Sequence, residues 1–188
     1  MSTIDIMVPE LPEAPPPTDL RMAPRTAVAP GASLTLIDTG KPRGRQLLEM
    51  IAARLDERLD LGAVTVYEKG SASRVIDQDE ARSLAESSDL VIAGLGDCGA
   101  CSACSLGDAL RMEGAGVPST VLISDVFVGH VASFAVTMGL PGYHASVVPH
   151  PVSSKDDEQL SAFADAVLDQ VLGQLTGADD QEFASVPA

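Results

Sequence analysis

The feature that most constrains the fold of this chain is a fivefold alternation of short apolar runs and amphipathic helical stretches. Apolar runs rich in Val, Leu and Ile are typical of buried parallel strands, whereas apolar residues at three- and four-residue intervals indicate helices. Strands are expected at 33–38, 63–67, 90–93, 120–125 and 145–148, and helices at 46–59, 77–87, 105–114, 127–138 and 156–175. This alternation predicts an α/β protein with helices on both faces of a parallel sheet.

Chain topology narrows the prediction further. Right-handed crossovers make such a sheet doubly wound, and for five strands we predict the flavodoxin-like order 2-1-3-4-5. One α/β domain is expected over residues 32–176, preceded by a Pro-rich N-terminal arm, 1–31, and followed by a C-terminal tail, 177–188. The prolines prevent a continuous helix or a central strand in the arm. The arm is therefore expected to be disordered or to extend over a partner, in a homo-oligomer or a hetero-oligomer.

All three cysteines lie in one turn, between the third strand and its helix. Cys98, Cys101 and Cys104 follow one another at three-residue steps, so in a helical conformation their sulfurs approach one side. A helix start offers unpaired N–H groups and the positive end of the dipole, which favour a thiolate. The array predicts either reactive cysteines or three metal ligands, for an iron–sulfur cluster, zinc or copper.

Charge and hydropathy exclude several classes of partner. The chain has 12 Lys and Arg against 27 Asp and Glu, a net charge of −15, which disfavours nucleic acid and anionic membranes. No apolar run approaches the roughly 20 residues of a membrane span, and the N-terminus lacks the pattern of a signal peptide. We expect a cytoplasmic protein whose thiols stay reduced, so catalysis or metal binding is favoured over a structural disulfide.

A basic loop, which contains Lys41, Arg43 and Arg45, follows the first strand. In the predicted strand order this loop and the cysteine turn lie at the carboxyl ends of neighbouring strands, where ligands bind. A cation near a cysteine lowers the pKa of its thiol and also binds a carboxylate or phosphate. The loop therefore predicts a small anionic substrate.

Further candidates lie at the ends of the later strands. Ser124 and Asp125 end the fourth strand and are predicted to bind substrate. His150 follows the fifth strand between two prolines, which restrict its backbone and suit an acid/base role. His130 and His144 are weaker candidates.

The cysteine turn also satisfies a second pattern. Gly94, Gly96 and Gly99 form G-x-G-x-x-G between a strand and a helix, and Asp125 ends the next strand as a ribose-binding acid would. That fingerprint normally opens the first βα turn, whereas two βα units precede it here. Dinucleotide binding is thus the less favoured interpretation.

Short motifs spread over roughly residues 33 to 154 carry a family resemblance. They are Asp38-Thr39-Gly40, Arg43-Gly44, Cys98-Gly99-Ala100-Cys101-Ser102, Asp108-Ala109, Glu113, Gly116-Val117-Pro118, Ser124-Asp125, Phe127 and Pro149-His150-Pro151. With these motifs the chain resembles the UGSC family, named for a selenocysteine-Gly-Ser-Cys motif. It departs from that motif in having Ala100 for serine and Cys98 where selenium stands.

The wider cysteine array is similar to the U-x-x-C-x-x-C turn in the selenoprotein subunits of glycine, sarcosine, betaine and proline reductases. The resemblance implies that Cys98 is a nucleophile and that Cys101 resolves its adduct. The leading hypothesis is a thiolate-dependent enzyme or catalytic subunit of the reductase or lyase type. The alternatives are a metal or iron–sulfur protein with Cys98, Cys101 and Cys104 as ligands, and a non-catalytic sulfur-carrier subunit.

Overall fold

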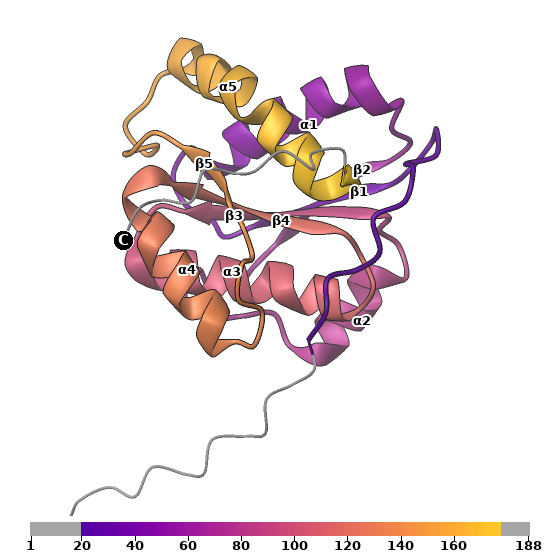
Figure 1. Cartoon of the computed structure of the whole chain (residues 1–188). Coiled ribbons are helices and arrows are strands. Elements are labelled where there is room, and N and C mark those ends of the chain that lie inside the picture. Colours follow the sequence, from indigo (N-terminus) through magenta and orange to yellow (C-terminus); the bar gives the residue numbers. More distant parts are fainter. Residues whose placement is uncertain (1–19, 178–188) are drawn as a thin grey trace, which may run out of the picture.

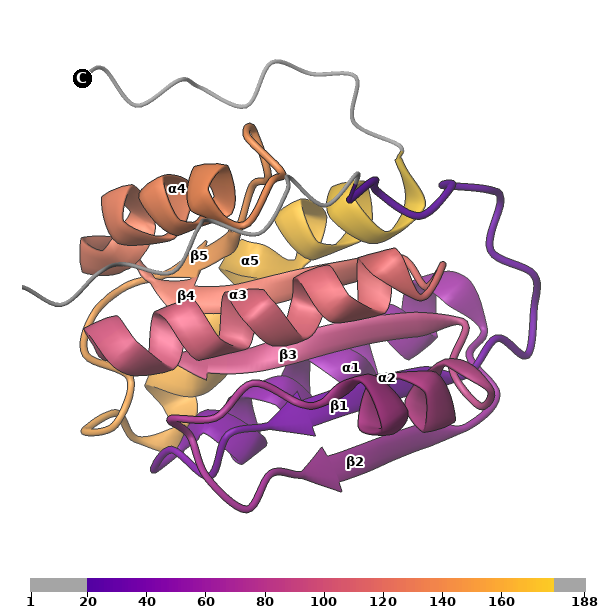
Figure 2. The same cartoon turned by 90° about the horizontal axis from the view of Figure 1, so that it is seen from below.

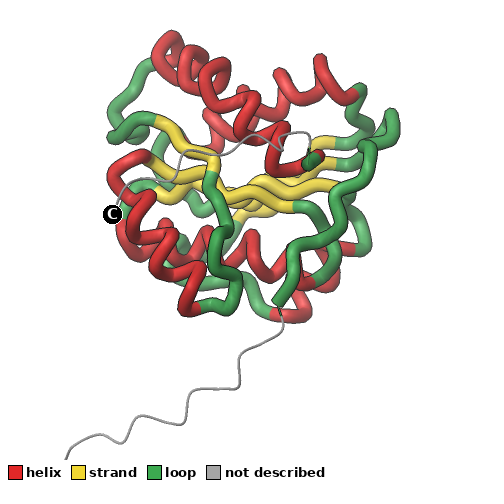
Figure 3. The backbone as a smooth tube through the Cα atoms, in the orientation of Figure 1, coloured by secondary structure: helices red, strands yellow, loops and turns green. Residues whose placement is uncertain are grey.

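A five-stranded parallel sheet forms the centre of the computed structural model, which describes residues 20–177 (Figures 1 and 3). The strands are β1 (Leu34–Asp38), β2 (Val64–Glu68), β3 (Leu90–Gly96), β4 (Ser119–Ser124) and β5 (Ser146–Val148). They lie in the order β2-β1-β3-β4-β5, and every neighbouring pair is parallel. The predicted flavodoxin-like order is confirmed.

Helices cover both faces of this sheet. They are α1 (Gly44–Leu59), α2 (Gln78–Ala85), α3 (Gly99–Gly114), α4 (Val128–Thr137) and α5 (Asp157–Thr176), with a short 3-10 turn, η1 (Asp125–Phe127), before α4. Helices α1 and α5 lie on one face, and α2, α3 and α4 lie on the other, with α3 in the middle (Figures 1 and 2). Among residues 20–177, no helix has both the length and the apolar character needed to cross a membrane.

The two helical layers give the sheet two cores. On the α1 and α5 face, Leu48 and Leu55 pack with Leu160 and other fully buried residues. On the opposite face, Ile37 and Leu106 belong to a second buried cluster. Every residue of β3 and β4 is buried, because these strands have neighbours on both edges and helices on both faces. The central strands therefore hold the cysteine turn in a fixed position.

Helix α3 begins six residues earlier than the sequence pattern predicted, at Gly99 instead of Ser105. Cys98 caps it in an extended conformation, and its sulfur accepts the N–H of Cys101. A sulfur cap is outside the usual set of oxygen-bearing caps, so the pattern gave no start signal there. By contrast, Asp156 forms a full capping box at the start of α5, where the prediction was within one residue.

The described part of the N-terminal arm lies against its own domain. Arg25 forms an ion pair with Glu113 at 2.5 Å and donates to the carbonyl of Gln174 at 2.9 Å. The backbone N–H of Ala23 donates to Glu113 at 2.6 Å. Residues 23–25 thus pack on this chain, and the predicted role of the arm toward a partner stays a prediction. The remaining arm, 1–19, and the tail from 178 lie outside the described residues.

Candidate functional site

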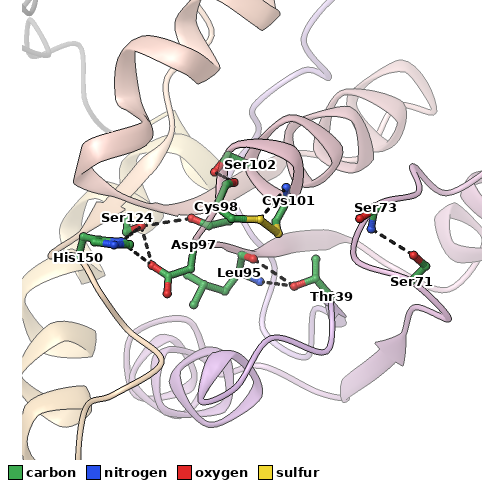
Figure 4. The surroundings of a disulfide bond; sticks show 11 residues. Thr39, Ser71, Ser73, Leu95, Asp97, Cys98, Cys101, Ser102, Ser124 and His150 are labelled. Atoms are coloured by element: carbon green, nitrogen blue, oxygen red, sulfur yellow. Dashed lines mark hydrogen bonds and ion pairs between the residues drawn. A yellow bond between two sulfur atoms is a disulfide. The ribbon is translucent and has the colours of Figure 1, made fainter.

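The cysteine turn lies at the carboxyl end of β3, where the chain enters α3 (Figure 4). Cys98 and Cys101 are joined in a disulfide, with sulfurs 2.09 Å apart and Cα atoms 5.3 Å apart. The sequence favoured reduced thiols over a disulfide, and the structure differs in holding the oxidised form of the pair. The cause is local, because a three-residue step at a helix start brings the two side chains together.

The two bonded cysteines differ in their exposure. Cys101 is 2% exposed, whereas Cys98 is only half-buried. The sulfur of Cys98 lies 3.3 Å from the N–H of Cys101, in the first turn of α3. Cys98 therefore combines access from outside with the helix-start environment that stabilises a thiolate.

Cys104 lies one turn further along α3 and is a half-buried free cysteine. Under the metal hypothesis its sulfur should join those of Cys98 and Cys101 around one ion. Within residues 20–177, no three His, Cys, Asp or Glu side chains are arranged to hold a metal ion. The disulfide also withdraws two of the three sulfurs, because a metal ligand must be a thiolate.

A hydrogen-bonded cluster of Asp97, Ser124 and His150 stands beside the cysteine turn (Figure 4). Oδ1 of Asp97 lies 2.7 Å from Oγ of Ser124 and 2.9 Å from Nδ1 of His150. Ser124 Oγ and His150 Nδ1 are 3.0 Å apart. The ends of β3 and β4 and the loop after β5 thus converge at one carboxylate.

The shared carboxylate fixes the orientation of His150. The side chain of Asp97 is 5% exposed, and its Oδ1 is placed to accept the Ser124 hydroxyl and a proton on Nδ1 of His150. In that tautomer Nε2 of His150 carries the lone pair, and no hydrogen bond from the described residues engages it. The His150 side chain is 34% exposed and packs edge-on against Phe127, with ring centroids 5.7 Å apart. This is the arrangement of an oriented acid/base group.

Ser124 and Asp125 hold His150 in place in this structure. Ser124 is fully buried, and Asp125 accepts the backbone N–H of His150 at 3.2 Å. The sequence assigned both residues to substrate binding. In this structure their contacts position the histidine, and their role in substrate binding stays a prediction. Asp125 was also the ribose acid of the dinucleotide interpretation.

The arginines of the basic loop are paired with acids of this chain. Arg43 pairs with Asp157 at the start of α5, and Arg45 pairs with Glu49 at 2.9 Å and also with Glu68. The hydrogen bond that Arg45 donates to Glu49 raises the pKa of Arg45. Both guanidiniums are thus engaged with carboxylates of this chain, while Nε of Arg43 is buried without a hydrogen-bond partner among the described residues. Topology places the loop but not the side-chain directions.

Lys41 is the remaining cation of the basic loop. A Cβ built on Gly44 would lie 3.5 Å from Cβ of Lys41 and 3.1 Å from Cβ of Leu95. The loop after β1 thus packs directly on the end of β3. Within residues 20–177 no ion pair engages Lys41, which is half-buried. Lys41 is therefore available to a ligand.

Two supporting contacts of the turn were not predicted. Thr39 Oγ1 accepts the N–H of Leu95 at 2.9 Å and donates to its carbonyl at 3.1 Å, so β1 fixes the end of β3. A Cβ on Gly96 would lie 2.8 Å from Cα of Ser102, so only glycine allows this approach of β3 to α3. Asp97 was also missed as a site residue, although an acid directly before Cys98 at a strand end was a usable signal.

The two weaker histidine candidates lie on different elements. His130 is in the first turn of α4, and its Nε2 would be 3.4 Å from a Cβ on Gly99, so its ring lies over the start of α3. His144 lies in the loop before β5. Of the three histidines, only His150 belongs to the Asp97 cluster.

Comparisons with known proteins bear on this fold and site. No curated protein matches the chain. Among solved structures, the diflavin flavoprotein A3 from Nostoc sp. is similar, with 15% identity, a TM-score of 0.38, and coverage of 78% of this chain and 96% of that one. The model of the UGSC family matches residues 5–177, a wider region than the motifs suggested. The chain therefore belongs to the UGSC family.

Proposed function

We propose that this protein is a thiol-dependent reductase, or the catalytic subunit of one, that uses Cys98 and Cys101 as a redox pair. The observation that carries the proposal is the pairing of a half-buried Cys98 with a 2% exposed Cys101 across the first turn of α3. An accessible thiolate attacks the substrate, and a shielded neighbour reaches only the adduct. Nucleophile and resolver follow from this difference in exposure.

The proposed cycle uses two electrons. The Cys98 thiolate attacks an electrophilic atom of the substrate, and a sulfur–substrate bond forms while the leaving group departs with its electron pair. Cys101 then attacks the Cys98 sulfur and loses its proton, which forms the disulfide and releases the second fragment with the electron pair of the broken bond. The substrate is reduced and the cysteines are oxidised. An external dithiol must return the pair to the reduced state.

His150 supplies proton transfer in this proposal. Its Nδ1 is hydrogen-bonded to Asp97, so Nε2 first takes up the proton of the attacking thiol and then gives it to a departing fragment. In Figure 4, His150 and the disulfide lie on opposite sides of Asp97. The substrate would therefore span the surface above Asp97, with its reacting atom at Cys98.

The proposed substrate is a small anion, as the basic loop predicts. Arg43 and Arg45 are engaged with carboxylates, so Lys41 and the N–H groups at the start of α3 are the groups that would hold the anion. A small anionic disulfide has both required properties, an electrophilic sulfur and a carboxylate, and it is the probe for the test.

The test is to trap the adduct. Reduced Cys101→Ser protein is mixed with glutathione disulfide and analysed by mass spectrometry with peptide mapping. We expect a mixed disulfide on Cys98, whereas reduced wild type loses two hydrogens and forms the Cys98–Cys101 bond. An adduct located on Cys104, or no adduct at all, would refute the assignment.

The matched control is Cys98→Ser, which removes the accessible sulfur and keeps Cys101. It should form no adduct under the same conditions. Repeating the reaction with a neutral disulfide, hydroxyethyl disulfide, tests the anionic preference separately. Equal reaction rates for the two probes would contradict the proposed preference for an anionic substrate. They would not contradict the proposed redox pair.

A further inference from the structure

A wide groove lies on the opposite side of α3 from the sheet, between α2 and α4, and the redox proposal does not use it. Its volume is about 1040 Å³. Helices α2 and α4 flank α3 in the view of Figure 2. The apolar lining includes Ala81 and Ala85 of α2, Leu110 of α3, and Val136, which is 61% exposed. A groove of this volume has room for another segment of chain or a small molecule.

The floor of the groove is shaped by glycines on α3. A Cβ on Gly107 would lie 2.8 Å from the side chain of Val75, and a Cβ on Gly114 would lie 3.0 Å from Cδ1 of Leu20. Leu20, the first described residue, is therefore seated directly on α3 and lines the groove. The described part of the chain thus begins in the lining of the groove.

We infer that the groove binds the chain's own N-terminal segment, residues 1–19. This segment carries five large apolar residues close together, Ile4, Ile6, Met7, Val8 and Leu11. Nineteen extended residues span roughly 60 Å, so the segment is long enough to line the groove. The family match begins at residue 5, so most of the segment belongs to the region shared by the family.

Charge supports the same occupant. Residues 1–19 contain four carboxylates, Asp5, Glu10, Glu13 and Asp19, and neither Lys nor Arg. The groove is lined by Arg111 of α3 and by Arg82 of α2, which also pairs with Asp79 at 2.8 Å, together with one acid, Glu86. An acidic, apolar segment is attracted to a mostly apolar groove with basic sides.

The absence of tryptophan from the chain gives a direct test. Ile6→Trp introduces a single indole into the segment of the full-length protein. We expect its emission at a shorter wavelength than that of free tryptophan, with reduced quenching by acrylamide, because the groove buries the ring. Both effects should be independent of protein concentration. Emission at the wavelength of exposed tryptophan would overturn the inference.

Groove variants identify the binding surface. In the Ile6→Trp protein, Arg82→Glu with Arg111→Glu should move the emission to longer wavelength, and so should Val136→Glu. All three side chains are exposed, so the fold is expected to persist, which urea unfolding checks. The matched control is Arg58→Glu, an exposed charge reversal on α1, which should change nothing. A buried indole that is insensitive to the groove variants would refute the assignment.

The oligomeric state shows whether the segment binds the groove of its own chain or that of a second copy of the protein. Sedimentation of the Ile6→Trp protein should give the same species before and after the groove substitutions. Burial of the indole only in a dimer, lost on dilution, would mean that the segment binds a neighbouring copy and would overturn the intramolecular inference. Neither result bears on Cys98, so the redox proposal is tested independently.

Discussion

The two ends of α3 each carry a carboxylate network, and the networks differ in what they leave exposed. At the C-terminal end, Glu113 is 1% exposed and accepts two hydrogen bonds from Arg25 and one each from the N–H groups of Ala23 and Ser119. At the N-terminal end, Asp97 holds His150, whose ring is partly exposed and whose Nε2 is unengaged among the described residues.

This difference separates a structural role from a chemical one. The network around Glu113 uses both carboxylate oxygens and connects the N-terminal segment, α3 and β4. Each group that donates a hydrogen bond to Glu113 belongs to this protein, so such a network stabilises the fold. The Asp97 network orients one side chain whose Nε2 is unengaged among the described residues, beside the Cys98–Cys101 disulfide. Substitutions at the two ends should therefore affect different measurements.

The largest effect on stability is expected for Glu113→Gln. Arg25, whose side chain is 12% exposed, would lose the negative charge that compensates its burial. Removing one partner of a buried ion pair costs about 3–5 kcal/mol of unfolding free energy. Urea unfolding measures the loss, and Asp97→Asn at the other end serves as the comparison. A larger loss for Asp97→Asn would contradict the division of roles.

The largest effect on chemistry is expected for His150→Gln. Loss of a general acid/base lowers a rate about 10²- to 10⁴-fold. The measurement is the rate at which the reduced protein reacts with glutathione disulfide, followed by loss of free thiol. The unfolding free energy should change by less than about 1 kcal/mol, because the ring is partly exposed. An unchanged rate would leave His150 with a structural role only.

A pH effect is expected at the Glu113 end. Tyr143 donates to the carbonyl of Ser119 at 2.9 Å, and burial, assisted by the Glu113 charge, raises its pKa well above the usual value. The folded state thus keeps the phenol proton that the unfolded state releases above roughly pH 10. Stability contributed by this group is complete below that pH and is lost as pH rises above it, by at most about 1.4 kcal/mol per pH unit.

Tyr143→Phe should reduce the alkaline slope of stability, measured by urea unfolding between neutral pH and the alkaline range. Tyr67 is the matched comparison, because its pKa is also raised, through its hydrogen bond to Glu80, but less strongly. Tyr67→Phe should therefore change the slope less. An identical slope in wild type and Tyr143→Phe would refute the prediction.

The smallest effect is expected for Cys104→Ser. A redox pair needs only Cys98 and Cys101, and Cys104 is free, so adduct formation and resolution should proceed at close to the wild-type rate. A metal site would lose a ligand that serine replaces poorly. Metal analysis of anaerobically purified protein and the disulfide reaction rate together measure the effect. Loss of bound metal along with activity would favour the metal hypothesis instead.

The site could be predicted from the sequence only in part. The three cysteines and His150 were identifiable, because residue type, spacing and flanking prolines are properties of the chain itself. Asp97 was not predicted, because its contacts depend on the loop after β5 folding back onto the end of β3. The ion pairs of the basic-loop arginines could not be predicted, because their acidic partners come from α1, β2 and α5.

Sequence alone determined the strand order, because hydrophobic periodicity and the handedness of crossovers act locally and leave few topologies. It also determined the placement of the cysteine turn at the carboxyl end of β3. Tertiary structure decided that Asp97 orients a partly exposed histidine and that Glu113 forms hydrogen bonds only within the fold. The reason is that the exposure and the hydrogen-bond partners of these two carboxylates depend on packing between segments distant in the sequence. No local sequence pattern encodes those contacts.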